Sequence, residues 1–168
     1  MNELFLLRHA DALNGEDDHG RVLSPRGVAE AAEVGARLRN LRSVSMKVLC
    51  SSALRAQETL EGLEDAEAFA PNDAVLPEVE TGLYLASASE MAARLRRLPA
   101  AAERVLLIAH NPGIHELAML LAGEGDRDAY ERLRGGLPPA GLCQFEIEAG
   151  WPDLRPGVGR LISCHWPG

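Results

Sequence analysis

The chain has 168 residues, of which 46% are hydrophobic and 25% are charged, and its formal net charge at pH 7 is -8. This length and composition exclude an intrinsically disordered chain and favour one folded domain over residues 1–168. An acidic chain lacks the basic surface that nucleic acids and anionic membranes require, so we expect neither as a partner.

The N-terminal residues carry neither a basic region nor a signal cleavage pattern, and no apolar run approaches the length of a membrane span. We therefore expect a cytoplasmic protein. The three cysteines, Cys50, Cys143 and Cys164, form an odd set without a close pair. This set indicates neither a disulfide framework nor a zinc cluster.

The first third of the chain predicts a strand, a loop and a helix. Residues 4–7 are an apolar run typical of a buried strand, and the run ends at the charged pair Arg-His at residues 8–9. Residues 11–22 are rich in Asp, Glu and Gly and predict an exposed loop. A Ser-Pro pair then opens a predicted helix at 24–41.

The rest of the chain alternates strand-like and helix-like segments. A helix that Pro112 opens and Gly123 caps is among them, and the last two strands are expected to form a hairpin. This alternation predicts an α/β fold with helices on both faces of the sheet. The remaining elements that we expect are strands at 47–50, 104–109, 142–148 and 160–166, helices at 53–66, 87–98 and 127–134, and a loop at 69–77.

Charged side chains follow three of these strands. Arg8 and His9 follow the first, Arg55 lies in the first helical turn after the second, and His110 follows the strand at 104–109. One such residue usually marks only the end of a strand. If the three strands are parallel neighbours, however, their side chains converge at the edge of the sheet where ligands bind in open α/β folds.

Such a cluster suits phosphoryl transfer. Two guanidinium groups and an imidazole can surround a phosphate, while His9 attacks phosphorus. Because the arginines neutralise the oxygens as charge develops, we expect no metal and no cofactor. Nearby arginines should keep His9 neutral, and its other ring nitrogen should donate to a backbone carbonyl.

Three segments, LLRHA at 6–10, SSALRAQET at 51–59 and HNPG at 110–113, resemble the motifs of the histidine phosphatase superfamily, also called phosphoglycerate mutase-like. The segment RVLSPRG at 21–27 resembles its small SixA-type branch of phosphohistidine phosphatases. The resemblance covers about the first two thirds of the chain. It implies a three-layer α/β sandwich with a mostly parallel central sheet flanked by helices.

The resemblance also implies roles for individual residues. His9 would accept the phosphoryl group, and Arg8, Arg55 and His110 would form the phosphate pocket. Arg21 matches a further phosphate ligand of the small branch, with a solvated loop charge as the alternative. The chain departs from the family pattern at Ala10, Val22 and Ser52, where glycine, proline and proline are common, and none of these changes removes a reacting group.

The proton donor to the leaving group is left open by the motifs. Larger relatives use a glutamate or aspartate, and Glu78 is the candidate by analogy. Asp11 and Asp18 are the alternatives, and each also fits a solvated loop carboxylate. A phosphohistidine substrate lessens the need for an acid, because imidazole leaves readily once it is protonated.

We therefore expect a metal-independent phosphatase that forms a phosphohistidine intermediate and acts on protein phosphohistidine. A broad-specificity phosphatase acting on small phosphorylated substrates is an alternative. A non-catalytic module that binds phosphate or a partner protein is another. A nucleotide-binding domain is disfavoured, because no Gly-rich phosphate loop follows any predicted strand.

Overall fold

The structure is a computed structural model that describes residues 1–41, 45–70 and 77–168. Most of the loop expected at 69–77 lies outside the described residues. The strands are β1 (Asn2–Arg8), β2 (Lys47–Ser51), β3 (Glu78–Glu80), β4 (Arg104–Ala109), β5 (Ala122–Gly125), β6 (Leu142–Ile147) and β7 (Gly159–His165). The helices are α1 (Pro25–Arg39), α2 (Leu54–Asp65), α3 (Ala88–Arg96), α4 (Gly113–Leu121) and α5 (Arg127–Arg134), with short 3-10 turns at Thr81–Leu83 and Trp151–Asp153.

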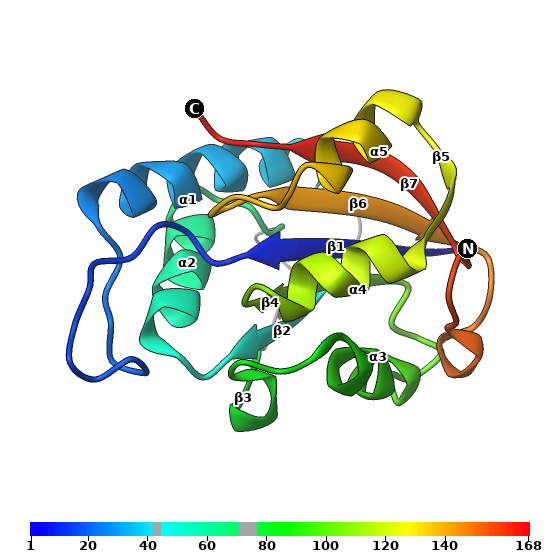
Figure 1. Ribbon diagram of the computed structural model, residues 1–168, viewed down its shortest axis with the longest axis horizontal. Coiled ribbons are helices and arrows are strands. Elements are labelled where there is room, and N and C mark those ends of the chain that lie inside the picture. The colour runs from blue at the N-terminus through cyan, green and yellow to red at the C-terminus, as the bar shows by residue number, and fades with distance from the viewer. Residues whose placement is uncertain (42–44, 71–76) are drawn as a thin grey trace.

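The strands form one mixed sheet in the order β3-β2-β4-β1-β6-β7-β5 (Figure 1). β6 pairs antiparallel with β1 and β7, whereas the other four pairings are parallel. The expected α/β fold with a mostly parallel sheet is therefore confirmed. Because β2, β4 and β1 are adjacent and parallel, the carboxyl ends of these strands share one edge of the sheet.

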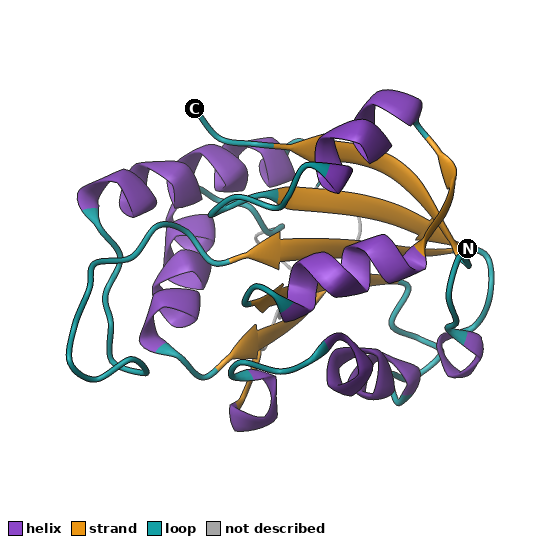
Figure 2. Ribbon diagram, in the orientation of Figure 1, coloured by secondary structure: helices purple, strands orange, loops and turns teal. Residues whose placement is uncertain are grey.

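Alternate residues of the strands pack on opposite faces of the sheet, as the pleat requires. In β1, Leu4 and Leu6 join a core cluster with residues of α3, α4 and α5, whereas Phe5 and Leu7 join a cluster with residues of α1 and α2. Figure 2 shows α4 crossing in front of the sheet. The side chains of residues 4–7 of β1 are all fully buried, which explains why this segment is a continuous apolar run.

Helices α1 and α3 begin directly after the serine residues that cap them. Ser24 Oγ accepts from the N–H of Gly27 at 3.0 Å, and Ser87 Oγ accepts from the N–H of Glu90 at 3.1 Å. The predicted helix cap at Gly123 is wrong, because this residue lies in β5. A Cβ there would lie 2.1 Å from the carbonyl oxygen of Gly157, so the glycine permits two backbone segments to approach closely.

No helix within the described residues is both long and apolar enough to cross a membrane.

Candidate active site

His9 directly follows β1, and its ring is oriented by the backbone. The backbone N–H of His9 donates to the carbonyl oxygen of Ala109 at 3.1 Å, which holds this residue beside the end of β4. Its Nδ1 lies 2.8 Å from the carbonyl oxygen of Ala10. Since a carbonyl can only accept, Nδ1 carries the proton and Nε2 presents a lone pair, as expected from the sequence.

Arg55, in the first turn of α2, contacts this lone pair. Its Nε donates to His9 Nε2 at 3.3 Å. Its two terminal nitrogens donate to Asp18, one to the carbonyl oxygen at 2.7 Å and the other to the carboxylate at 3.2 Å. The Arg55 side chain is only 3% exposed, so its fork of donors is held in a fixed place.

His110 directly follows β4 and lies beside His9, with the two ring centroids 5.1 Å apart. Its Nε2 is 2.6 Å from the hydroxyl of Ser51, the last residue of β2. The same hydroxyl accepts from the N–H of Ala53 at 3.2 Å. Nδ1 of His110 is buried and has no hydrogen-bond partner among the described residues.

Both histidines are neutral at physiological pH. Burial, with a smaller contribution from the charges of Arg55 and Arg8, lowers the pKa of His9 from 6.5 to about 4. Burial, followed by the neighbouring His9 and Arg55, lowers the pKa of His110 to about 3. Desolvation, rather than the arginines expected from the sequence, is the larger cause of the neutral form of His9.

Arg8, the last residue of β1, completes this edge of the sheet. One terminal nitrogen of its guanidinium donates to the carbonyl oxygen of Leu137 at 3.0 Å. Its Nε is buried without a partner among the described residues. Arg8 thus retains an unused donor beside the histidines, and its charge acts on both rings.

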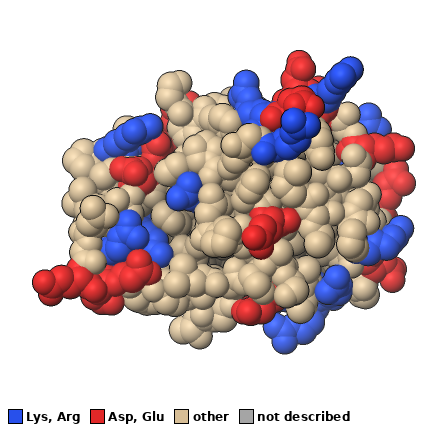
Figure 3. All heavy atoms as spheres, in the orientation of Figure 1, with Lys and Arg blue, Asp and Glu red and all other residues tan. Residues whose placement is uncertain are grey.

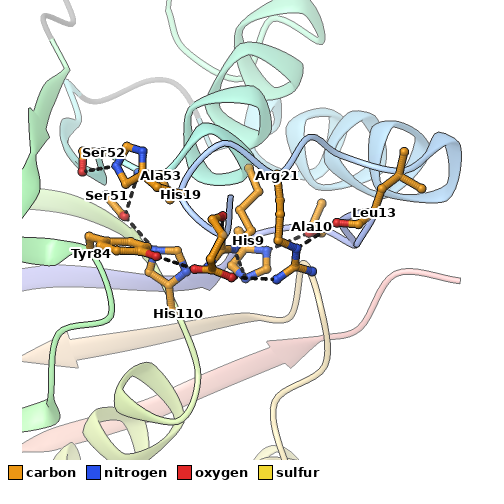
Figure 4. Close-up of polar contacts among 12 residues, drawn as sticks. His9, Ala10, Leu13, His19, Arg21, Ser51, Ser52, Ala53, Tyr84 and His110 are labelled. Carbon is orange, nitrogen blue, oxygen red and sulfur yellow. Dashed lines mark hydrogen bonds and ion pairs between the residues drawn. The ribbon is translucent and has the colours of Figure 1, made fainter. Parts of the chain in front are cut away.

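The loop after β1 brings the carboxylate of Asp18 to this site, and Figure 4 shows two of its partners, Arg21 and Tyr84. Asp18 accepts from Arg55, from Arg21 at 3.2 Å and from the hydroxyl of Tyr84. The Tyr84 hydrogen bond and the two arginines lower the pKa of Asp18 to about 2, so it is ionised at neutral pH. Figure 3 shows acidic and basic side chains lying against one another at the end of the molecule that carries this loop.

The structure does not bring Glu78 to His9. Its carboxylate pairs with Lys47 at 2.6 Å and with Arg94 at 2.7 Å, on β2 and α3. The hydrogen bond from Lys47, and the charges of Lys47 and Arg94, lower the pKa of Glu78. Asp11 also points elsewhere, because its carboxylate accepts from the Ser24 hydroxyl at 2.6 Å at the start of α1.

Three residues of this region were missed by sequence reasoning. Ser51 lies inside the motif at 51–59, but only the fold shows that it contacts His110. The ring of Tyr84 lies 5.6 Å from that of His110 and 4.8 Å from that of His19. Nothing local in the sequence marks Tyr84 or His19.

The end of the second motif anchors the site rather than lining it. Gln57 donates to the carbonyl oxygen of Ser52 at 2.8 Å. Glu58 accepts from the N–H of Leu23 at 2.8 Å and so ties the loop to α2. Thr59 accepts from the N–H of Ala10 at 3.0 Å. Within the ranges that the structure describes, no group of three or more His, Cys, Asp or Glu residues could hold a metal ion.

Comparisons with known proteins identify the family of this chain. The sequence profile of the histidine phosphatase superfamily (branch 1) matches residues 4–137. An uncharacterised protein of Mycobacterium tuberculosis is 32% identical in an alignment 168 positions long that covers 96% of this chain and 99% of that protein.

Solved structures share the whole fold. One from Nakamurella multipartitia, provisionally named phosphohistidine phosphatase SixA, has a TM-score of 0.84 and 28% identity and covers 99% of this chain and 96% of its own. Another, from Agrobacterium tumefaciens, resembles the fold with a TM-score of 0.79 at 24% identity, covering 99% of each chain. The chain therefore belongs to the histidine phosphatase superfamily, in its SixA-type branch, and is a phosphatase.

Proposed function

We propose that the chain is a protein phosphohistidine phosphatase that works without a metal ion through a phosphorylated His9. The observation that carries this proposal is the lone pair on Nε2 of His9, which the Ala10 carbonyl orients and Arg55 flanks. A neutral imidazole beside a guanidinium is a nucleophile placed next to the group that binds its electrophile.

The charges around His9 match those of a phosphate. The charges of Arg55, Arg8 and Arg21 all act on the ring of His9, and Asp18 pairs with two of these arginines. A phosphoryl dianion is attracted to this cluster of positive charges. Its oxygens can take the donors of Arg55 that Asp18 now holds, and they can also take the unused Nε–H of Arg8.

His110 supplies a further donor when the Ser51 hydroxyl donates a hydrogen bond to Nε2 and the ring proton lies on Nδ1. In that tautomer Ser51 Oγ accepts from Ala53 and donates to His110, and Nδ1–H is free for a phosphate oxygen. Ser51 therefore acts as a positioning residue for His110. The contact with Ser51 fixes this donor before substrate binds, so it can stabilise charge in the transition state without reorganisation.

The reaction proceeds in two displacements. The lone pair of His9 Nε2 attacks phosphorus. The bond from phosphorus to the leaving group breaks, and its electron pair goes to the leaving group. Water then attacks the phosphorus of phospho-His9, loses a proton to solvent and releases phosphate, and Nε2 recovers its lone pair. Arg55 leaves Nε2 for a phosphate oxygen in the first step, because both groups cannot use the same lone pair.

The leaving group decides the substrate class. Among the described residues, Asp18 places its carboxyl group beside Arg55 at the carboxyl ends of the strands. With a pKa of about 2, it holds no proton to donate at neutral pH. An alkoxide needs such a proton, whereas the imidazole of a phosphohistidine takes one from water before its P–N bond breaks. This contrast favours phosphohistidine over alkyl phosphates.

The proposal is tested by phosphate release in the presence of a chelator. The substrates are a phosphohistidine protein, free phosphohistidine, an aryl phosphate and a sugar phosphate. We expect release from the phosphohistidine protein, with kcat/KM at least about 100-fold above that for the sugar phosphate. His9→Ala should lower kcat by at least about 1,000-fold while still binding inorganic phosphate.

The control is His165→Ala, which removes a histidine of β7 that pairs with Glu33. Equal turnover of all four substrates would instead identify a broad-specificity phosphatase. Phosphate binding without turnover of any substrate would identify a non-catalytic module. Full activity of His9→Ala would eliminate the covalent mechanism.

A further inference from the structure

Cys143 and Cys164 lie directly opposite each other on the neighbouring antiparallel strands β6 and β7. Their sulfur atoms lie 3.5 Å apart, although 21 residues separate them along the chain. This separation explains why their spacing indicated no pair. Both are free thiols in the structure.

The pairing suits a covalent bond. Opposed residues of antiparallel strands have Cα atoms about 4.5–5.5 Å apart. This interval lies within the range of roughly 4.4–6.8 Å that disulfides span. Only the sulfurs must approach, to about 2.05 Å, so rotation of two side chains with a small local shift of the strands suffices.

The two thiols differ in access and acidity. Cys143 is fully buried, whereas Cys164 is partly exposed and borders a cavity of about 300 Å³ that Arg132 also lines. The hydrogen bond from Cys143, aided by the charge of Arg132, lowers the pKa of Cys164. The same contact and burial raise the pKa of Cys143. An accessible, more acidic thiol beside a protected one is the usual arrangement of an attacking and a resolving cysteine.

We propose that Cys143 and Cys164 form a dithiol site that low-molecular-weight disulfides such as glutathione disulfide convert into a cross-strand disulfide. The Cys164 thiolate attacks one sulfur of the oxidant and releases one thiolate. The sulfur of Cys143 then attacks the mixed disulfide, and its proton goes to the second departing thiolate. The two cysteines are oxidised by two electrons, and one disulfide is reduced to two thiols.

The third cysteine provides an internal reference. Cys50 is buried in β2, and burial, with the nearby Glu64, raises its pKa to about 12. Trypsin separates the three cysteines, because they lie in peptides 48–55, 135–160 and 161–168. A bond between Cys143 and Cys164 therefore joins two peptides that are otherwise distinct.

The test treats the reduced full chain with glutathione disulfide, alkylates the remaining thiols in denaturant, and digests without reductant. We expect peptide 135–160 linked to 161–168 and alkylated Cys50. Before alkylation, we expect a monomer whose intact mass has fallen by two hydrogens. Alkylation of both Cys143 and Cys164 would refute the proposal. So would a bond between two chains, or glutathione retained on the wild-type protein.

Single variants test the order of attack. Cys143→Ser should retain glutathione on Cys164, because the resolving thiol is gone. Cys164→Ser should leave Cys143 alkylated and free of glutathione, because Cys143 is buried. The reverse labelling would overturn the assigned order. None of these measurements depends on phosphatase activity, so they stand or fall separately from the proposed function.

Discussion

Arg55 donates its Nε–H to Nε2 of His9 across 3.3 Å, so in the proposed mechanism the guanidinium that binds the substrate also covers the atom that attacks it. The same proposal requires that this contact keeps Nε2 unprotonated until a phosphate oxygen draws Arg55 away. Charge alone is not sufficient for this task, because an ammonium lacks the planar fork of a guanidinium.

We therefore expect Arg55→Lys to lower kcat/KM for the preferred substrate by about 100-fold, close to the loss in Arg55→Ala. The matched control is Arg26→Lys on α1, where the arginine side chain is 80% exposed. Steady-state kinetics of the three variants provide the comparison. Retention of more than half the activity by Arg55→Lys would show that charge, rather than the fork, is what the site requires.

In the proposed site, Asp18 competes with phosphate for Arg55. Removing its carboxylate in Asp18→Ala should lower the inhibition constant for inorganic phosphate by about tenfold, equivalent to about 1.4 kcal/mol. Turnover of phosphohistidine should remain, because the leaving group needs no proton from Asp18. Asp17→Ala is the control, since it removes the same charge from the same loop. A large fall in kcat for Asp18→Ala alone would instead make Asp18 the proton donor.

The sequence predicted the side chains that lie directly at the ends of strands. His9, Arg55 and His110 follow three apolar runs, and parallel pairing of those runs is enough to bring them together. Local signals also placed the main helices, because Ser24 and Ser87 cap them as their sequence context indicates. The two shortest strands, β3 and β5, were missed, since three or four partly exposed residues leave no periodic pattern.

Contacts made by loops were not predictable in this way. Tyr84 reaches Asp18 across 66 residues, and this contact depends on how two irregular segments fold over the edge of the sheet. Analogy with larger relatives suggested Glu78, but Lys47 and Arg94 hold that carboxylate at a different edge. Side chains on loops require the tertiary structure before their partners are known.

Ser51 is expected to act through His110 rather than on the substrate. Ser51→Ala removes the hydroxyl 2.6 Å from His110 Nε2, so the ring loses its preferred tautomer. We expect kcat to fall about tenfold with little change in KM, and Ser51→Thr to restore most of the loss. The neighbouring variant Ser52→Ala is the comparison, because its hydroxyl pairs with His19 instead. An equal loss in Ser52→Ala would mean that the effect is a general disturbance of this segment.

The buried histidines make stability depend on pH. As pH falls from 7 to 5, the unfolded chain takes up a proton at His110 with a pKa near 6.5, whereas the folded chain, with a pKa of about 3, does not. The free energy of unfolding therefore decreases with falling pH, by about 2 kcal/mol for this residue. His110→Gln should lose about 2 kcal/mol less than the wild type between pH 7 and 5 in urea titrations. Identical pH slopes would contradict the depressed pKa.

Thr59 joins the exit of β1 to α2, and its loss should destabilise the fold. Its Oγ1 accepts from the N–H of Ala10 at 3.0 Å and donates to the carbonyl oxygen of Arg55 at 2.7 Å, and the side chain is fully buried. Thr59→Val keeps the shape but leaves the Ala10 N–H without an acceptor. We expect a loss of about 1–3 kcal/mol in urea denaturation. The same change at exposed Thr81 should stay within about 0.5 kcal/mol of the wild type. Equal effects at both positions would show that the tie between Ala10 and Thr59 contributes nothing, and the position of His9 would then depend on its bond to Ala109.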